Sequence, residues 1–192
     1  LLDLQPARLA AFCSAKGRMQ ASFIGFKGAH DDILLAISRD LLPQTLKRLS
    51  MFVLRAKAKL SDATADFHLL GLMVSAVPPG TPARWSLHAQ GDEAIVNFYP
   101  AAGQARALWI APSSTPAASA TLAPDQWLWS EVASGVATVS QPVYELFVPQ
   151  MLNYESIGGV NFKKGCYPGQ EVVARSQFRG TLKRRAFIAH AP

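Results

Sequence analysis

Two apolar runs near the N-terminus, residues 19–28 (MQASFIGFKG) and 31–38 (DDILLAIS), follow one another with only a short connection around Gly28 to Asp31. Each run has the length and the β-branched or aromatic content of a strand, and the connection has the length of a turn. The pattern predicts a β-hairpin, or two adjacent strands. It therefore predicts an antiparallel sheet at the start of the chain.

The segment that follows, residues 39–63, has apolar residues at helical spacing and basic residues mostly on the other faces. The apolar positions are Leu42, Leu46, Leu49, Phe52, Val53, Ala56 and Leu60. Pro43 suits the first turn of a helix. Residues 66–76 (DFHLLGLMVSA) then predict a strand. The order strand, strand, helix, strand is typical of a split α+β layer, with a helix on one face of an antiparallel sheet.

After a turn at 77–82, three short runs predict strands that continue this sheet; they are residues 84–90, 93–99 and 106–112. Residues 111–124 are rich in Pro, Ala and Ser, which predicts a loop or linker and the main candidate domain boundary. Residues 125–139 predict a short helix ending near Gly135, and 143–160 a mostly irregular segment. The expected organisation is an α+β subdomain over 1–110, a linker over 111–124, and a second part over 125–192.

The composition is that of an ordinary soluble globular protein, with 49% hydrophobic and 17% charged residues in 192. No apolar run reaches the roughly 18–20 residues that span a bilayer, so no membrane association is expected. The two cysteines, Cys13 and Cys166, are too few and too distant for a disulfide scaffold. They predict reduced thiols in a cytoplasmic protein. The four histidines are scattered, and no metal site is expected.

The formal charge of +6 is concentrated near the C-terminal end. Residues 163–192 contain seven Lys or Arg and one Glu, while the rest of the chain is balanced. A basic segment of this kind favours an anionic partner: nucleic acid, phosphate or a polycarboxylate ligand. The alternative is a solvated helix face followed by a basic tail.

Within this basic segment, Gly165 and Gly169 bracket Cys166, Tyr167 and Pro168 in a tight loop. Residues 170–178 (QEVVARSQF) predict the helix that follows. A thiol ahead of a helix N-terminus and beside lysines experiences a positive potential, which favours the thiolate. The pattern therefore indicates a reactive or ligand-facing thiol. The alternative is a small buried hydrophobic residue that caps the loop.

The stretch KKGCYPGQEVVAR resembles the K-G-C-Y-x-G-Q-E signature of the YgfZ family, folate-binding proteins similar in fold to the glycine-cleavage T-protein, an aminomethyltransferase. The matching positions are Lys164, Gly165, Cys166, Tyr167, Gly169, Gln170 and Glu171, followed by Arg175. The stretch FCSAKGRMQASF resembles a second family pattern, carried by Cys13, Lys16, Gly17 and Arg18. The resemblance extends from about residue 4 to the end and is weakest over 77–124.

The resemblance implies a T-protein-like folate-binding fold. Family members carry further sequence upstream and a small β-barrel domain downstream, both of which this chain is expected to lack. The implied function is tetrahydrofolate binding in support of the assembly or repair of iron–sulfur clusters in client enzymes, including enzymes of tRNA modification. No cluster ligand set is visible, so the clusters are expected to be held by those clients.

The same resemblance implies roles for the motif residues. Cys166 is the candidate reactive thiol, at the mouth of a folate site. The candidate folate-binding residues are Lys164, Gly165, Tyr167, Gly169, Gln170, Glu171 and Arg175. Gln170 and Glu171 are also expected to begin the helix and hold the loop, and Arg175 to pair with Glu171 at i, i+4 or to reach a ligand carboxylate. Tyr167, Trp127 and Trp129 are candidates to cover a pterin, with core packing as the alternative for the tryptophans.

Two other functions are compatible with parts of the sequence. An aminomethyltransferase would share the fold, but T-proteins usually carry an acidic residue two positions before the glycine equated with Gly135. Here that position is Ala133, with Glu131 two residues away, so this activity is not expected. An RNA-binding module would use the basic C-terminal segment. No RNP, KH or helix-turn-helix pattern is present, so direct nucleic-acid binding is not expected either.

Overall fold

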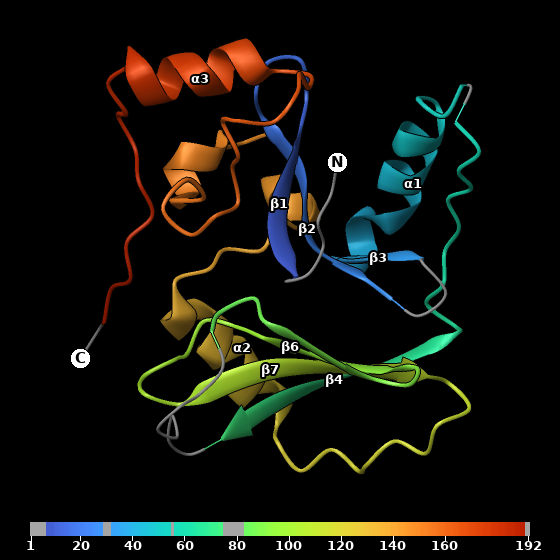
Figure 1. The fold of residues 1–192 in the computed structure, drawn as a ribbon. Helices are drawn as coiled ribbons and strands as arrows, with labels where there is room; N and C mark the ends of the chain where they lie inside the picture. Colours follow the sequence, from blue (N-terminus) through green and yellow to red (C-terminus); the bar gives the residue numbers. More distant parts are fainter. Residues whose placement is uncertain (1–6, 29–31, 55, 75–82, 191–192) are drawn as a thin grey trace.

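The computed structural model describes residues 7–28, 32–54, 56–74 and 83–190. Its strands form two separate antiparallel sheets, one above the other in Figure 1. The first sheet has the order β1-β2-β3 and consists of β1 (Arg8–Cys13), β2 (Met19–Lys27) and β3 (Ile33–Ile37). The second has the order β4-β7-β6-β5 and consists of β4 (Phe67–Val74), β5 (Leu87–Gln90), β6 (Glu93–Asn97) and β7 (Ala105–Pro112).

The first sheet confirms the predicted pairing of the two N-terminal apolar runs. β2 and β3 are antiparallel, with Phe23 opposite Ile37 and Lys27 opposite Ile33. β1 was not predicted as a strand. It pairs along β2 from Arg8 opposite Gly25 to Cys13 opposite Met19, with an irregularity between Phe12 and Cys13. Because β2 is the central strand, eight of its nine residues are buried or half-buried.

The second sheet corrects the prediction that strands over 84–112 continue the first one. Those strands exist, but they pair with β4 and with each other. β4 and β7 pair along eight residues, from Phe67 opposite Pro112 to Val74 opposite Ala105. The physical reason is that pairing partners of strands are set by contacts far apart in the sequence, which local patterns do not encode.

The first helix is shorter than the predicted 39–63. A 3-10 turn (Arg39–Leu41) leads into α1 (Leu42–Ser50), and residues 51–54 and 56–66 contain no helix or strand. Helical stability in proteins comes mainly from packing an apolar face. Beyond Ser50 that face packs poorly: Phe52 is 60% exposed, and Val53 is only half-buried. Figure 1 shows α1 extending away from the edge of the first sheet.

The other two helices confirm the sequence predictions. α2 (Pro124–Ser134) begins with a proline and ends at Gly135, whose φ of 71° closes the helix in the left-handed conformation. α3 (Gln170–Phe178) follows Gly169. Residues 113–123 have no helix or strand. Residues 143–160 contain the end of one 3-10 helix (Gln141–Val143), a second 3-10 helix (Pro149–Leu152), and otherwise turns and irregular structure. The predicted turn at 77–82 lies outside the described residues.

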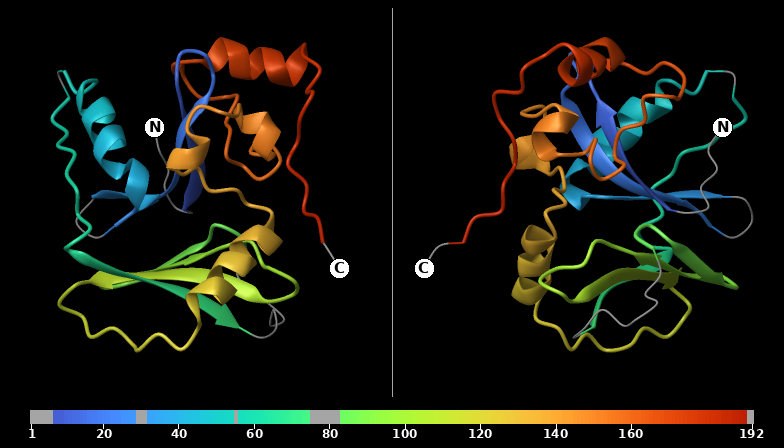
Figure 2. Two further views of the ribbon diagram at one scale, coloured as in Figure 1. Left: turned by 180° about the vertical axis from the view of Figure 1, so that it is seen from behind. Right: turned by 60° about the vertical axis from the view of Figure 1, so that its left-hand side comes forward.

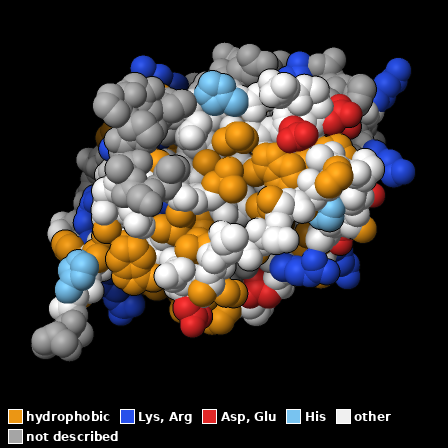
Figure 3. All heavy atoms as spheres, turned by 90° about the horizontal axis from the view of Figure 1, so that it is seen from below, with side chains coloured by type: hydrophobic (Ala, Val, Ile, Leu, Met, Phe, Trp, Pro, Cys, Tyr) orange, Lys and Arg blue, Asp and Glu red, His pale blue; other side chains and the backbone are white. Residues whose placement is uncertain are grey.

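α2 packs on the second sheet, on the side that faces the first sheet (Figures 1 and 2). Gly71 in β4 makes this contact possible, because a Cβ there would lie 2.7 Å from the Trp127 ring. Strand side chains alternate between faces, so the neighbouring Leu72 points to the opposite face. Leu72 is 39% exposed, and Figure 3 shows hydrophobic side chains gathered over that end of the molecule.

The hydrophobic core has two clusters. One lies between the first sheet and the loops of the C-terminal third, and includes Met19, Leu41 and Tyr154. The other lies between the two sheets and includes Phe26 and Val96. Ile24 and Trp85 pack against both clusters and so lie at the junction of the layers. None of the helices in the described segments is long and apolar enough to cross a membrane.

Candidate functional site

The two glycine-containing motifs, which are about 150 residues apart in the chain, contact each other directly. Gly169 has φ 80°, and a Cβ there would collide with the Ser14 carbonyl oxygen and lie 2.7 Å from Gly17 Cα. Gly17 has φ 69°, and its own Cβ would lie 2.9 Å from Val172 Cβ. Glycine is therefore required on both sides of this contact. The contact places the β1–β2 turn against the start of α3, as Figure 1 shows.

The two cysteines occupy opposite environments within this region. Cys166 is exposed and Cys13 is buried, and both thiols are free. The exposure of Cys166 excludes the alternative in which it is a buried residue that caps the loop. Burial raises the pKa of Cys13 to about 11, an effect that the nearby positive charge of Lys164 partly offsets. The exposed thiol of the motif is thus the one available to a ligand or partner.

Lys164 and Tyr167 lie together beside Cys13. The Lys164 Nζ is 4.7 Å from the centroid of the Tyr167 ring, a cation–π distance. Burial raises the pKa of Tyr167, and the proximity of Cys13 raises it further. The motif loop therefore lies against the end of β1 through Tyr167, while Lys164 and Gly165 remain exposed.

The remaining motif residues shape the loop and the helix. Gln170 is the first residue of α3, and its Oε1 accepts a hydrogen bond from the Tyr167 backbone N–H at 3.3 Å. Glu171 and Arg175 are both exposed. The predicted i, i+4 ion pair is not formed, since no salt bridge joins these two described residues. Instead α3 is anchored by the fully buried Gln150, whose Nε2 donates to the Val173 carbonyl at 2.8 Å.

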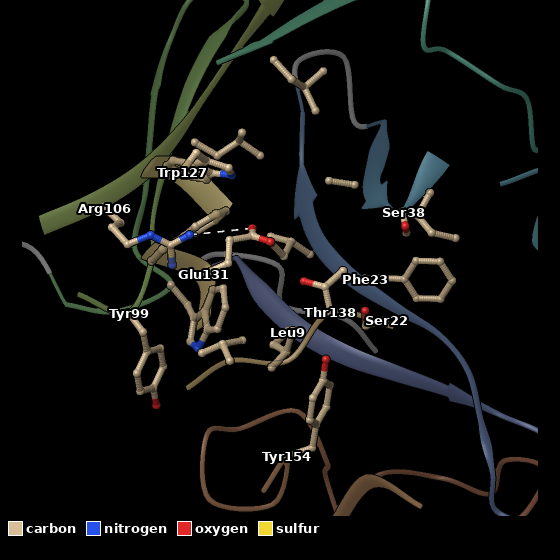
Figure 4. A pocket seen from close by; sticks show the side chains of 18 residues that line it. Leu9, Ser22, Phe23, Ser38, Tyr99, Arg106, Trp127, Glu131, Thr138 and Tyr154 are labelled. Carbon is tan, nitrogen blue, oxygen red and sulfur yellow. Dashed lines mark ion pairs between the residues drawn. The ribbon is translucent and has the colours of Figure 1, made fainter. Parts of the chain in front are cut away.

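A separate cavity of about 330 Å³ lies between the two sheets (Figure 4). Its walls come from β1, β2, β3, β4, β7, α2 and the adjoining loops. The aromatic lining residues are Phe23, Trp85, Phe98, Tyr99, Trp127 and Tyr154, and the polar ones are Ser22, Ser38, Arg106, Glu131 and Thr138. None of the motif residues from Lys164 to Arg175 lines it. The structure thus separates the thiol loop from the cavity.

Arg106 and Glu131 form a charged pair at the cavity wall, drawn with a dashed line in Figure 4, in which the Arg106 side chain is buried and the Glu131 side chain is 36% exposed. Arg106, on β7, is only 4% exposed, and its Nη2 lies 3.7 Å from Glu131 Oε1. Its guanidinium carbon is 4.6 Å from the Trp127 ring centroid and 5.8 Å from that of Phe98. Burial lowers the pKa of Arg106, and Glu131 opposes this effect.

The two tryptophans proposed from the sequence have different surroundings. Trp127 lines the cavity, packed between Gly71 and Arg106. Trp129 is 51% exposed and does not line the cavity. Sequence reasoning missed both Arg106 and Trp85. Arg106 was detectable as a lone charge within an apolar strand, RALWIAP. Trp85 has φ 63°, a strained conformation for a bulky residue, which no sequence pattern indicated.

No group of three or more His, Cys, Asp or Glu side chains that could hold a metal ion occurs in the part of the chain that the structure describes. Of the carboxylates in the described segments, only Glu131 lines the cavity. The arrangement therefore offers a cavity with aromatic walls and one charged pair, and, apart from it, an exposed thiol on a glycine-framed loop.

No family model matches the chain. Curated relatives do. It is 28% identical over 183 residues to an uncharacterized protein of Haemophilus influenzae, a match that covers 94% of this chain and 59% of the relative. It is 29% identical over 195 residues to the tRNA-modifying protein YgfZ of Edwardsiella ictaluri, covering 93% and 58%. Over 59 residues, 31% of this chain and 18% of the relative, it is 48% identical to the tRNA-modifying protein YgfZ of Cronobacter sakazakii.

The chain thus spans less than two thirds of the length of the relatives that it matches along most of its own length. The matches support the resemblance to YgfZ proteins that the K-G-C-Y-x-G-Q-E motif indicates, since two of these relatives are named YgfZ. The predicted relationship is therefore confirmed: the chain is a homologue of the YgfZ proteins.

Proposed function

We propose that this protein binds a tetrahydrofolate derivative and supports tRNA modification in the cytoplasm by helping to assemble or repair iron–sulfur clusters in client enzymes. The observation that carries the folate part is the cavity of about 330 Å³ between the sheets. The tRNA-modification part is supported by the names of the relatives. A T-protein-like arrangement of the two sheets is part of the same proposal.

The cavity suits a flat heterocycle with a polar edge. Its volume is within the range of about 300–1,000 Å³ found for small-molecule sites, and such sites are mostly apolar with a few placed polar groups. Here the apolar walls include Trp127 and Trp85, and the charged groups are Arg106 and Glu131. A pterin ring combines these properties. The cationic loop around Lys164 is the candidate site for the carboxylates of the glutamate tail.

The exposed Cys166 supplies the thiol that acts on the client enzyme in this proposal. It lies on a loop with the exposed Lys163 and Lys164, on a glycine-framed support. We propose that this loop meets the client enzyme, or a sulfur species that the client holds, while the protein itself carries no cluster. Gly165 and Gly169 shape the loop, and Gln170 and Glu171 begin the helix behind it.

A tetrahydrofolate titration followed by tryptophan fluorescence tests the folate proposal. Saturable quenching is expected, because Trp85 and Trp127 line the cavity. Lys164→Ala is expected to weaken binding by roughly 10- to 150-fold, because a lost charge-assisted hydrogen bond to the ligand's carboxylates costs about 1.5–3 kcal/mol. Lys163→Ala, the exposed neighbour outside the signature, is the matched control. Absence of saturable quenching in wild type contradicts folate binding.

Cys166→Ala is expected to abolish the restoration of an iron–sulfur client in cells that lack their own YgfZ. The variant should fold normally because the side chain is exposed. Cys13→Ala removes the other thiol and is the control, with restoration expected to persist. The measurement is client enzyme activity in the complemented cells. Full restoration by Cys166→Ala would mean that the thiol is not used.

A second candidate function, aminomethyl transfer to tetrahydrofolate, is favoured by one observation. Although the position two residues before Gly135 is Ala133, the carboxylate of Glu131 lines the cavity. A direct assay for methylene-tetrahydrofolate formation separates the two functions. Product formation that Glu131→Gln removes would establish the transferase.

A further inference from the structure

We propose that Arg106 and Glu131 together read the amino-lactam edge of the ligand's ring. In this arrangement Arg106 donates to the ring carbonyl, and the Glu131 carboxylate accepts from the ring N–H and the exocyclic amino group. This edge is shared by pterin and guanine. The assignment of the pterin as its natural carrier rests on the proposed folate function.

The first observation is that the buried guanidinium is incompletely paired. Arg106 is 4% exposed, and its Nε and Nη2 have no hydrogen-bond partner in the described part of the chain. The 3.7 Å between Nη2 and Glu131 Oε1 is an ion-pair distance but too long for a hydrogen bond. Buried polar groups in native proteins are nearly always hydrogen-bonded, so an unpaired buried guanidinium requires an explanation. A ligand oxygen in the cavity supplies the missing acceptor.

The second observation is that the donor and the acceptor lie together at the aromatic wall of the cavity. Trp127 and Glu131 are one turn apart on α2, so they share a helix face, and both line the cavity. Figure 4 shows the two side chains and Arg106 converging from α2 and β7. The indole is fixed from behind by its close packing on Gly71. The Arg106 guanidinium lies over the same ring, 4.6 Å from its centroid, so the N–H donor and the carboxylate acceptor stand together at the aromatic wall of the cavity.

The third observation is that the described part of the chain places no other charged residue at the cavity. Among the described residues that line it, Arg106 and Glu131 are the only ones of a charged type; the other polar groups are hydroxyls and the indole N–H groups of Trp85 and Trp127. A neutral ring with adjacent acceptor and donor groups can satisfy both members of the pair at once. A simple anion or cation would satisfy one and repel the other, so the pair selects for an edge of mixed hydrogen-bonding character.

The test is isothermal titration of the whole chain with 5-formyltetrahydrofolate, tetrahydrobiopterin, p-aminobenzoylglutamate and guanosine. Glu131→Gln keeps the size of the side chain but presents a donor where the ligand also has donors. It is expected to weaken binding of 5-formyltetrahydrofolate and of the pterin fragment by at least about tenfold, because a site built for one hydrogen-bonding pattern rejects the unpaired one. Asp125→Asn, at an exposed carboxylate on the same helix, is the matched control and should change nothing.

A double-mutant comparison separates edge reading from general damage. A folate analogue without the 2-amino group should bind wild type more weakly than the parent, and Glu131→Gln should lose this preference, as interacting groups are non-additive. Arg106→Lys keeps the cation but removes the planar donor fork, and it should weaken the ligands that carry the ring carbonyl. The Arg106→Lys variant also keeps this part of the test possible if the Arg106→Ala variant does not fold.

The outcomes distinguish the two proposals. If wild type binds no folate compound, the proposed function fails. If wild type binds folate and Glu131→Gln binds equally well, the edge assignment is overturned while folate binding stands. Binding of p-aminobenzoylglutamate without the pterin fragment also overturns the assignment. Binding of guanosine alone, with the same sensitivity to Glu131→Gln, supports edge reading and contradicts the folate proposal.

Discussion

Gly169→Ala is expected to destabilise the protein by about 3 kcal/mol or more. Part of this loss is conformational, since a left-handed backbone costs an alanine roughly 1–2 kcal/mol. The larger part is steric. The new Cβ would collide with the Ser14 carbonyl oxygen, a backbone atom that already accepts a hydrogen bond from Gly17 N at 2.9 Å. Relief therefore requires the β1–β2 turn and the start of α3 to separate.

Urea unfolding of the two proteins measures this loss, and Gly103→Ala is the matched control. Gly103 has φ 79°, nearly the value of 80° at Gly169, but no atom lies within 4 Å of the site of its Cβ. The control therefore carries the backbone strain without the collision, and should lose only about 1–2 kcal/mol. Equal losses in the two variants would show that the contact between the two motifs contributes nothing.

The second large effect concerns the two thiols. Cys166 is expected to react with iodoacetamide at least about 100-fold faster than Cys13 in the native protein, because thiolate content and access control the rate. Cys13 is 5% exposed, and burial raises its pKa from the usual 9.0 to about 11. At pH 8 only about 0.1% of a thiol with that pKa is ionised.

Alkylation kinetics of Cys13→Ala and Cys166→Ala, each with one remaining thiol, give the two rates separately by mass spectrometry. In denaturant the two rates should become similar, because both thiols are then exposed. Comparable rates in the folded protein would contradict the burial of Cys13. Selective labelling of Cys166 would also provide a probe for the client proposed to meet this loop.

The raised pKa of Cys13 also has a consequence for stability. The folded state favours the neutral thiol, so its contribution is fully present below the unfolded pKa and is lost as pH rises through the folded value. Stability should therefore fall between about pH 9 and pH 11. The fall should be shallower in Cys13→Ala.

Several elements were predictable because their signals are local. The pairing of β2 with β3 follows from two apolar runs and a short connection. The end of α2 follows from Gly135, and the start of α3 from Gly169. Each depends on residues within a few positions of the feature itself, and in each case the structure agrees.

The length of α1 and the division into two sheets were not predictable in this way. The apolar spacing over 39–63 continues past Ser50, yet the helix ends where its apolar face loses a surface to pack on. β1 was missed because its pairing with β2 decides its conformation. Strands over 84–112 were recognised, but which strands they join depends on contacts across the whole chain.

The same distinction between local signals and long-range contacts applies to the candidate sites. By itself, the sequence determined the thiol motif and the relationship to YgfZ proteins, because residue identities at fixed spacing are sufficient for both. Only the tertiary structure decided that Gly17 meets Gly169, that Cys166 is exposed while Cys13 is buried, and that Arg106 and Glu131 meet beside Trp127. These features depend on close packing between segments that are distant in the sequence. The burial of a side chain and the residues that it contacts set its charge pairing and its reactivity, and both are defined only in the folded protein.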